Sequence, residues 1–297
     1  MSLFQFEVFL KVVDTGNFTK AGGNLGLTQS GVSHNISALE SELGIILLNR
    51  GRNGVSLTDA GKRIIGHMRN IVSESEQIKQ KTAAILGIEM GKIKIGSFPS
   101  TSAKLLPGII SYFKSRYEGI ELELYEGSYD EITEWVENGV IDIGFVSLPV
   151  KRLETIPLLK DKLVVLVPSD HPFREHKSLT IEQLSQEPFI MPKAGCEVLV
   201  KERFQSNGLQ PNIHFEVEDN QTIISMVQEG LGLTVIPQLT LPNWLTQVST
   251  VELVPETYRT IGLAVKSRKD CTPAVKEFII ASQKFVKTNS ENNKPYL

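Results

Sequence analysis

The chain has 297 residues, 41% of them hydrophobic and 22% charged, which is typical of a globular protein with about two or three domains. Its formal net charge of -3 excludes a protein drawn to nucleic acid or membrane by an overall positive charge, so any such contact has to be local. The two cysteines lie far apart in the sequence and form no disulfide framework or zinc pattern. The sequence shows neither a signal peptide nor an apolar run of roughly 18 residues. We therefore expect a cytoplasmic protein without membrane contact.

Residues 1–60 show the pattern of several short helices. Apolar side chains recur on one face of a first helix, and residues 18–26 form a second. A tight connection then leads to Thr28, which is placed to cap a third helix that runs to about Gly44. Two helices joined by a very short turn are typical of a helix-turn-helix, and the Gly-punctuated stretch that follows predicts a small β-wing.

The third helix carries an apolar stripe on one side and short hydrogen-bonding side chains on the other. Such short donors and acceptors can read base edges when a helix enters the major groove of DNA. Arginines on the wing suit phosphate or minor-groove contact. The sequence therefore predicts binding to double-stranded DNA through Thr28, Gln29, Ser30, Ser33, His34 and Asn35 on the helix and Arg50 and Arg52 on the wing.

From Thr58 to about Gly87 the sequence predicts one long helix. Its apolar residues recur every three or four positions and form an imperfect heptad seam, while the other faces are polar. A lone helix of this length would leave the seam exposed. We therefore expect it to pair with a second copy of the chain; the seam consists of Ile64, Met68, Ile71, Ser75, Ile78, Thr82 and Ile85.

Beyond residue 90, strands and helices alternate, which implies mostly parallel sheets covered by helices. We expect three parts: a winged helix-turn-helix at 1–58, a dimerisation helix and hinge at 59–90, and an effector-binding domain at 91–297. In the last part, subdomain I comprises 91–163 and 267–297, and subdomain II comprises 164–266. The chain would cross near Val165 and return near Val265, as in hinged, clam-like binding domains.

The sequence resembles the LysR-type transcriptional regulators over nearly its whole length. The resemblance rests on GNFTKAGGNLGLTQSGVSHNISALESELG, LLNR and VSLTDAGKRI, and further on EGSYDEITEWVENGVIDIGFV, LVPSDHP and VQEGLGLTVIP. It implies a winged helix-turn-helix, a two-subdomain effector domain resembling periplasmic binding proteins, a homodimer or homotetramer, no enzymatic activity and no cofactor. A small-molecule effector would close the cleft and change how the oligomer holds its DNA-binding pairs.

Three positions depart from the pattern that the resemblance implies. Gly22 and Gly23 replace residues of better helix propensity, at roughly 1 kcal/mol of helix stability each. Leu48 stands where the family usually has Phe. His34 replaces the usual Arg of the recognition helix, which weakens the expectation of the family's commonest DNA contact there.

The charge of the first 62 residues argues against strong binding by one copy of the head. Five basic residues face five acidic ones, so the count sums to zero. Because nonspecific affinity for DNA comes mainly from neutralised phosphates, a neutral head binds weakly alone. We expect several heads to act together on a DNA site with two-fold symmetry.

The ends of the predicted strands mark a candidate effector cleft, because ligands of open parallel sheets lie beyond the carboxyl ends of the strands. Several of these ends carry hydroxyls and precede helices, which favours a small anion or carboxylate. The resemblance implies inducer contacts from Ser100, Thr101 and Ser128. The full candidate set is Ser100, Thr101, Ser102, Ser128, Phe145, Ser147, Pro192, Lys193, Asn220 and Ile236.

The sequence leaves two alternatives to a regulator, a solute-binding protein and an enzyme. A solute-binding protein would share the two-lobed domain, but the helix-turn-helix and the missing export signal argue against it. An enzyme would need an ordered acid–base or metal set, and the five scattered histidines show no ligand spacing. A redox role for Cys196 stays open, although the resemblance implies two cysteines in that subdomain and Cys271 lies in the returning segment.

Overall fold

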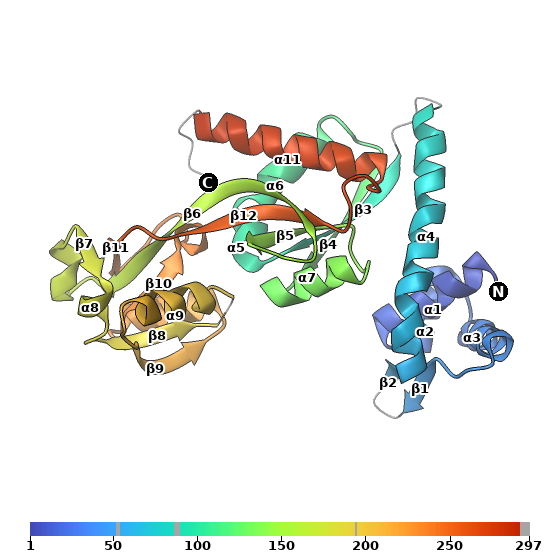
Figure 1. Ribbon diagram of the computed structural model, residues 1–297, viewed down its shortest axis with the longest axis horizontal. Helices are drawn as coiled ribbons and strands as arrows, with labels where there is room; N and C mark the ends of the chain where they lie inside the picture. Colours follow the sequence, from blue (N-terminus) through green and yellow to red (C-terminus); the bar gives the residue numbers. More distant parts are fainter. Residues whose placement is uncertain (52–53, 86–89, 194, 292–297) are drawn as a thin grey trace. The chain divides into compact units, whose positions relative to one another are not determined.

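The structure is a computed structural model that describes residues 1–51, 54–85, 90–193 and 195–291. The chain divides into two compact units, one running to residue 88 and the other beginning at residue 89, with the short segment 138–140 grouped with the first. Each unit is described by itself below (Figure 1).

Three short helices open the first unit: α1 (Leu3–Thr15), α2 (Phe18–Leu25) and α3 (Gln29–Leu43). Each begins at a side chain that accepts backbone N–H groups, from Ser2, Asn17 and Thr28 respectively. Each ends at a glycine in the left-handed region, where a side chain would be strained: Gly16, Gly26 and Gly44. The two-residue connection between α2 and the Thr28 cap confirms the helix-turn-helix that the sequence predicts.

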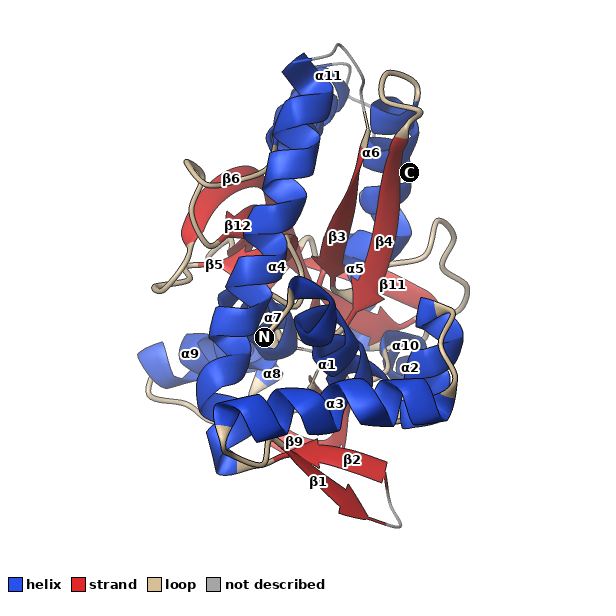
Figure 2. Ribbon diagram, turned by 90° about the vertical axis from the view of Figure 1, so that its right-hand side faces the viewer, coloured by secondary structure: helices blue, strands red, loops and turns tan. Residues whose placement is uncertain are grey.

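A wing and a long helix complete this unit. Strands β1 (Leu48–Gly51) and β2 (Gly54–Leu57) pair antiparallel beside α3 (Figure 2). Helix α4 (Asp59–Ile85) follows, and Thr58 caps it by accepting the Gly61 N–H at 3.0 Å. The apolar stripe of α3 packs inward with α1 and with the first turns of α4, so the polar face of α3 stays outside.

The second unit begins with three parallel strands at one end of an eight-stranded sheet. Its elements are β3 (Gly91–Ser97), α5 (Pro99–Lys104), α6 (Leu106–Lys114), β4 (Ile120–Glu126), α7 (Tyr129–Glu137) and β5 (Ile143–Leu148). Strand β3 lies between β4 and β5 and pairs parallel with both, so the carboxyl ends of the three strands meet at one edge. The last helix, α11 (Pro273–Glu291), packs against α6 (Figure 1).

The second subdomain is built from shorter elements. They are η1 (Pro172–Glu175), β7 (Ser178–Thr180), α8 (Ile181–Leu184), β8 (Pro188–Pro192), α9 (Glu197–Ser206), β9 (Asn212–Val217), α10 (Asn220–Gln228), β10 (Thr234–Pro237), η2 (Gln238–Thr240) and β11 (Val248–Val254). Strand β10 separates two apolar clusters, because Val235 packs with α8 and α9 and Ile236 packs with α10.

Two long strands connect the subdomains. The first half of β6 (Glu154–Pro168) pairs with β12 (Tyr258–Val265), and its second half pairs with β10 and β11. Figure 1 shows β6 and β12 running together from one group of elements toward the other. The first crossing therefore lies near Leu163, close to the expected Val165.

The return crossing differs from the expectation. All of β12 lies in the first subdomain, because its other edge pairs antiparallel with β5 from Thr260 to Ala264. The return therefore falls between Val254 and Tyr258 and not near Val265. An apolar run such as TIGLAV predicts a buried strand but does not say which sheet the strand joins.

Some elements were not anticipated. Residues 99–114 form two short helices, α5 and α6, with Pro107 in the first turn of the second, where its missing N–H costs nothing. Strands β7 and β11 and helix α8 were not expected. Strand β7 and helix α8 have only three and four residues, too few to show a hydrophobic period, whereas β11 lies between β6 and β7 in the sheet.

Candidate nucleic-acid interface and effector cleft

The polar face of α3 presents most of the predicted DNA contacts to solvent. Asn35 is held to its own helix, donating to the Gly31 carbonyl at 2.9 Å. The hydroxyls of Thr28 and Ser30 lie 3.0 Å apart, so the cap and the first turn form one hydrogen-bonded group. Thr28, Gln29, Ser30 and His34 are exposed, and Ser33 and Asn35 are half-buried.

Arg50 joins the wing to this helix. Its Nη1 donates to the Ser33 hydroxyl at 3.2 Å, and its guanidinium carbon lies 4.8 Å from the centre of the Phe18 ring. The other predicted wing contact, Arg52, lies outside the described residues. Arg50 therefore lies at the same surface as the recognition helix, where one phosphate could meet both.

Glu40 fixes the other end of the wing to α3. Its side chain is 8% exposed, and one carboxylate oxygen accepts the N–H groups of Leu47 at 2.7 Å and Leu48 at 3.1 Å. These are the residues with which the wing begins. A charge-assisted, buried pair of hydrogen bonds thus holds wing and helix as one body.

The zero charge sum of the head does not show where its acidic side chains lie. Glu40 is buried, and Asp14 pairs with Arg69 of α4 at 3.0 Å, a cation that the count over residues 1–62 leaves out. Glu40 in turn lies 3.9 Å from Arg50, so two of the five acidic groups in the count are committed to cations.

Helix α4 leaves an apolar stripe in solvent. Ile71, Ile78 and Ile85 are 48%, 67% and 84% exposed and recur every seven residues. Ile65 and Met68, one to two turns earlier, are buried in the core of the head. The stripe therefore begins where the head ends, as a seam for a second helix would.

In the second unit, a buried ion pair lies between β6 and β12. Arg259 and Asp161 each have a side chain 2% exposed, with 2.6 Å between Nη2 and Oδ2. Arg259 also donates from Nη2 to the Ser100 hydroxyl at 2.8 Å and from Nη1 to the Tyr129 hydroxyl. Asp161 accepts the backbone N–H of Leu239 at 3.0 Å. One cation and one anion thereby gather groups from both subdomains.

Aromatic rings close the space around this pair. The Arg259 guanidinium lies 5.0 Å from the centre of the Phe98 ring, whose edge-on neighbour is Tyr129 at 4.7 Å. Burial raises the pKa of the Tyr129 hydroxyl to about 12, against the opposing charge of Arg259. Burial alone would lower the pKa of Arg259, but Tyr129 and Asp161 outweigh it and raise that pKa, so the guanidinium stays charged.

One buried hydroxyl at this place lacks a partner. Thr101 is fully buried, and its Oγ1 has no hydrogen-bond partner within the described parts of the chain. Leaving such a group unsatisfied costs about 1–3 kcal/mol. The carboxyl end of β3 therefore carries an unused donor one residue away from Ser100.

A cavity of about 780 Å³ opens beside Tyr129. It brings together three of the predicted effector residues, Ser128, Ser147 and Lys193, from three different strand ends. Ser128 is engaged locally, since its hydroxyl donates to Glu131 at 2.8 Å, and Lys193 pairs with Glu216 at 2.6 Å.

The other predicted effector residues do not line this cavity. Ser100 is buried and accepts a hydrogen bond from Arg259. Ser102 is half-buried in α5. Asn220 is half-buried at the start of α10. The remaining four residues are buried: Thr101, Phe145, Pro192 and Ile236.

Tyr129, Asp161 and Arg259 were not predicted from the sequence. A signal was present, because Arg259 continues the alternation of Ile261, Leu263 and Val265, all buried on one face of β12. Asp161 likewise continues the alternation of the buried residues Leu163, Val165 and Val167 on β6. A charge in phase with a buried strand face predicts a buried ion pair.

Comparison with known proteins gives the family. Residues 3–62 match the bacterial regulatory helix-turn-helix of the lysR family, and residues 87–285 match the LysR substrate binding domain. The chain belongs to the LysR family of transcriptional regulators. YvbU of Bacillus subtilis, described as an uncharacterised HTH-type transcriptional regulator, is 41% identical over 94% of this chain and 97% of its own.

Solved structures of LysR-family members share the fold. A full-length OxyR variant from Pseudomonas aeruginosa has a TM-score of 0.77 at 21% identity and covers 97% of this chain and 95% of its own. CbnR complexed with its target DNA has a TM-score of 0.65 at 21% identity, with 96% and 100% covered. The family confirms a winged helix-turn-helix joined to an effector domain, in a regulator and not an enzyme.

Two kinds of feature are absent from the described residues of this LysR-family chain. No helix there is both long enough and apolar enough to span a membrane. No group of three or more His, Cys, Asp or Glu side chains in those residues is arranged to hold a metal ion.

Proposed function

We propose that this LysR-family regulator senses a small anion or carboxylate in the cleft between its subdomains. The observation that carries the proposal is the buried, charged guanidinium of Arg259, bonded to Ser100 and Tyr129 beside the unpartnered hydroxyl of Thr101. A planar guanidinium pairs bidentately with carboxylates. An incoming anionic group would replace the hydroxyls of Ser100 and Tyr129 as the acceptor of the Arg259 N–H groups. The ion pair of Arg259 with Asp161 would remain.

The contact residues follow from this placement. We propose that Ser100 and Thr101 hold the anionic group, with Ser128, Ser147 and Lys193 lining its approach through the 780 Å³ cavity. We propose Ser102, Phe145, Pro192, Asn220 and Ile236 as further contacts. The buried Phe145, Pro192 and Ile236 would become accessible only as the subdomains separate. Effector binding would then shift the balance between closed and open arrangements of the two subdomains.

At the other end of the chain, we propose that α3 enters the major groove and that the wing follows the backbone. The helix would contact DNA through Thr28, Gln29, Ser30, Ser33, His34 and Asn35, and the wing through Arg50 and Arg52. The exposed stripe of α4 would pair with that of a second copy, giving a dimer or tetramer in the cytoplasm on a two-fold symmetric site. The domain boundaries proposed are 1–58, 59–90 and 91–297.

Thermal unfolding of the full-length protein against a panel of small carboxylates, amino acids and inorganic anions tests the effector proposal. A compound at 100 times its dissociation constant should stabilise the folded protein by roughly 2.7 kcal/mol. The stabilisation should disappear in the double variant Ser100→Ala/Thr101→Ala, whose DNA binding should remain. A double variant that responds to the compound as the natural chain does would refute the assignment.

A further inference from the structure

Tyr129 separates Arg259 from the 780 Å³ cavity. Its side chain is part of the cavity wall, and its hydroxyl accepts a hydrogen bond from Nη1 of Arg259. The other described side chains that bond or stack on Arg259 do not line that cavity: Ser100, Asp161 and Phe98. A molecule in the cavity therefore meets the Tyr129 ring before it meets the guanidinium.

The Tyr129 ring lies against the backbone of the other subdomain at Gly195. Gly195 has a φ of +99°, and a Cβ built on it would lie 2.6 Å from Cδ2 and 2.7 Å from Cγ of the ring. Any side chain at position 195 would therefore push the ring away. Tyr129 begins α7 in the first subdomain, whereas Gly195 precedes α9 in the second. The way to Arg259 is thus closed by one residue from each subdomain.

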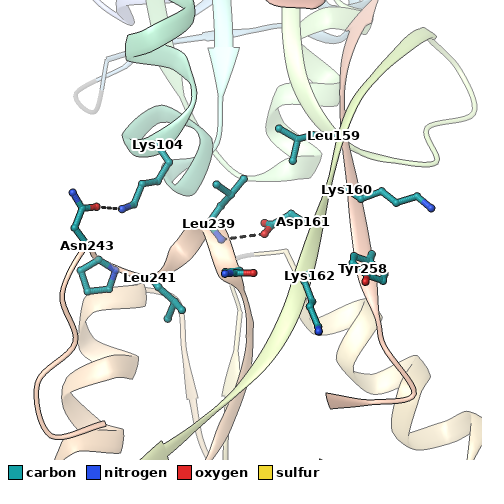
Figure 3. A pocket seen from close by; sticks show the side chains of 11 residues that line it. Lys104, Leu159, Lys160, Asp161, Lys162, Leu239, Leu241, Asn243 and Tyr258 are labelled. Atoms are coloured by element: carbon teal, nitrogen blue, oxygen red, sulfur yellow. Dashed lines mark hydrogen bonds between the residues drawn. The ribbon is translucent and has the colours of Figure 1, made fainter. Parts of the chain in front are cut away.

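The opposite side of Arg259 is held by a stronger partner. Asp161 lines a second cavity, of about 370 Å³, and accepts the Leu239 N–H at 3.0 Å, the bond drawn in Figure 3. An anion that arrives from this side has to displace an ion-paired carboxylate, whereas one that arrives past Tyr129 displaces a hydroxyl. The ion pair adds a Coulomb attraction that the hydroxyl lacks, so the approach past Tyr129 is the easier one.

We propose that Tyr129 is the gate of the effector cleft and determines which compounds reach Arg259. The inference rests on the function proposed for that cleft. Without effector, the phenol occupies the guanidinium in place of the anionic group. Binding requires the ring to leave Gly195 and the effector anion to replace the phenol on Nη1. A carboxylate offers Arg259 a charged acceptor in place of a neutral one and is favoured, whereas a neutral amide or alcohol has no such advantage and is excluded.

The gate sets affinity as well as selectivity. The Tyr129 hydroxyl stays neutral at pH 7, because burial raises its pKa to about 12. Since the ring has to move before an effector binds, the apparent affinity is lowered by the fraction of molecules in which the cleft is open. Tyr129→Phe leaves Nη1 of Arg259 without this acceptor in the empty cleft. We expect this variant to bind carboxylates about tenfold more tightly than the natural chain.

A first test needs no effector and uses phenylglyoxal, which modifies accessible arginines, on the full-length protein. We expect Arg259 to be protected in the natural chain and to lose this protection in Tyr129→Ala, as located by peptide mass spectrometry. Arg152 lines the same cavity with a side chain 83% exposed and serves as the internal standard. Val198→Ala shortens another side chain of this cavity, 56% exposed, and should leave Arg259 protected.

Equal labelling of Arg259 in the natural chain and in Tyr129→Ala, relative to Arg152, would overturn the proposal. Loss of protection in Val198→Ala as well would overturn it too, because any opening of the cavity would then suffice. Should Tyr129→Ala fail to fold, Tyr129→Leu takes its place, since it keeps an apolar side chain beside the Phe98 ring.

A second test measures binding, by thermal unfolding in acetate and in its neutral isostere acetamide at constant ionic strength. The acetate concentration that gives half of the full stabilisation should be about tenfold lower for Tyr129→Phe than for the natural chain. Acetamide should stabilise the natural chain less than acetate does. Equal acetate concentrations for the two chains would refute the gate and leave anion sensing intact. If no anion of the panel stabilises either chain, anion sensing is refuted, and the labelling of Arg259 still decides whether Tyr129 is a gate.

Discussion

Arg259 and Asp161 form an ion pair at the point where the chain crosses between the subdomains, with 2.6 Å between the guanidinium and the carboxylate. Each has a further partner on a different side, because Arg259 bonds Ser100 of the first subdomain and Asp161 bonds Leu239 of the second. The pair therefore links both halves of the effector domain through the two strands that join them.

Removing one member of this pair should be costly. Asp161→Asn leaves a buried guanidinium without its counter-charge, and we expect a loss of about 3–5 kcal/mol in the free energy of unfolding of the effector domain. The double variant Asp161→Leu/Arg259→Met removes both charges and should lose less than the single variant. Urea unfolding followed by the fluorescence of the effector domain measures both values. Losses that simply add in the double variant would show that the two groups do not depend on each other.

The two adjacent glycines of α2 should respond in opposite ways to alanine. A Cβ on Gly23 would meet nothing within 4 Å, so Gly23→Ala should stabilise the head by about 1 kcal/mol through helix propensity. A Cβ on Gly22 would lie 2.6 Å from the Leu27 carbonyl oxygen in the turn, so Gly22→Ala should destabilise it. The thermal midpoints of the two variants test this, and equal shifts of the same sign would contradict it.

The exposed stripe of α4 should govern oligomer formation. Ile71→Glu/Ile78→Glu places two charges in the proposed seam and should shift the protein toward monomer at micromolar concentration. Ser73→Glu, on the polar face of the same helix, is the control and should leave the mass unchanged. Analytical ultracentrifugation gives both masses. A double variant that keeps the mass of the natural chain would show that the seam lies elsewhere.

The cysteines should be unreactive in the folded protein. Burial raises the pKa of the Cys196 thiol to about 12 and that of Cys271 to about 11, so at pH 8 roughly one Cys196 side chain in 10⁴ is a thiolate. We expect Ellman's reagent to label both thiols rapidly only after denaturation. Rapid labelling of Cys196 in the native chain, located by mass spectrometry, would instead support redox sensing.

Gln29 should contribute to sequence preference. It is exposed at the start of α3 and can pair bidentately with adenine. Gln29→Ala should weaken binding to a high-affinity site selected from random DNA by about 1–3 kcal/mol and leave binding to unrelated DNA unchanged. The exposed Ser41, near the other end of the helix, supplies the control Ser41→Ala. An equal loss on both DNAs would assign Gln29 to the backbone.

The helix-turn-helix and the alternation of the effector domain could be predicted because both are local patterns. Thr28 caps α3 as its position indicates, and the apolar stripe of α3 is buried. The sheet to which β12 belongs could not be predicted, because strand pairing depends on a partner more than one hundred residues away.

The cleft shows the same division between local and distant information. Hydroxyls at strand ends were found because they are adjacent to predicted helices. The Arg259–Asp161 pair was missed because its members are 98 residues apart and Asp161 lies between two lysines of β6, which offer nearer apparent partners. Their phase with the buried positions was visible, but no local rule pairs one such charge with the other.

The buried Glu40 fixes the distance between the recognition helix and the wing. Because this distance is fixed, the recognition helix and the wing meet the DNA double helix at a constant separation. DNA whose groove width or curvature suits that separation is bound without deformation, and other sequences have to bend at an energetic cost. Base pairs between the helix and wing contacts, which no side chain touches, would then still affect which promoters this protein occupies.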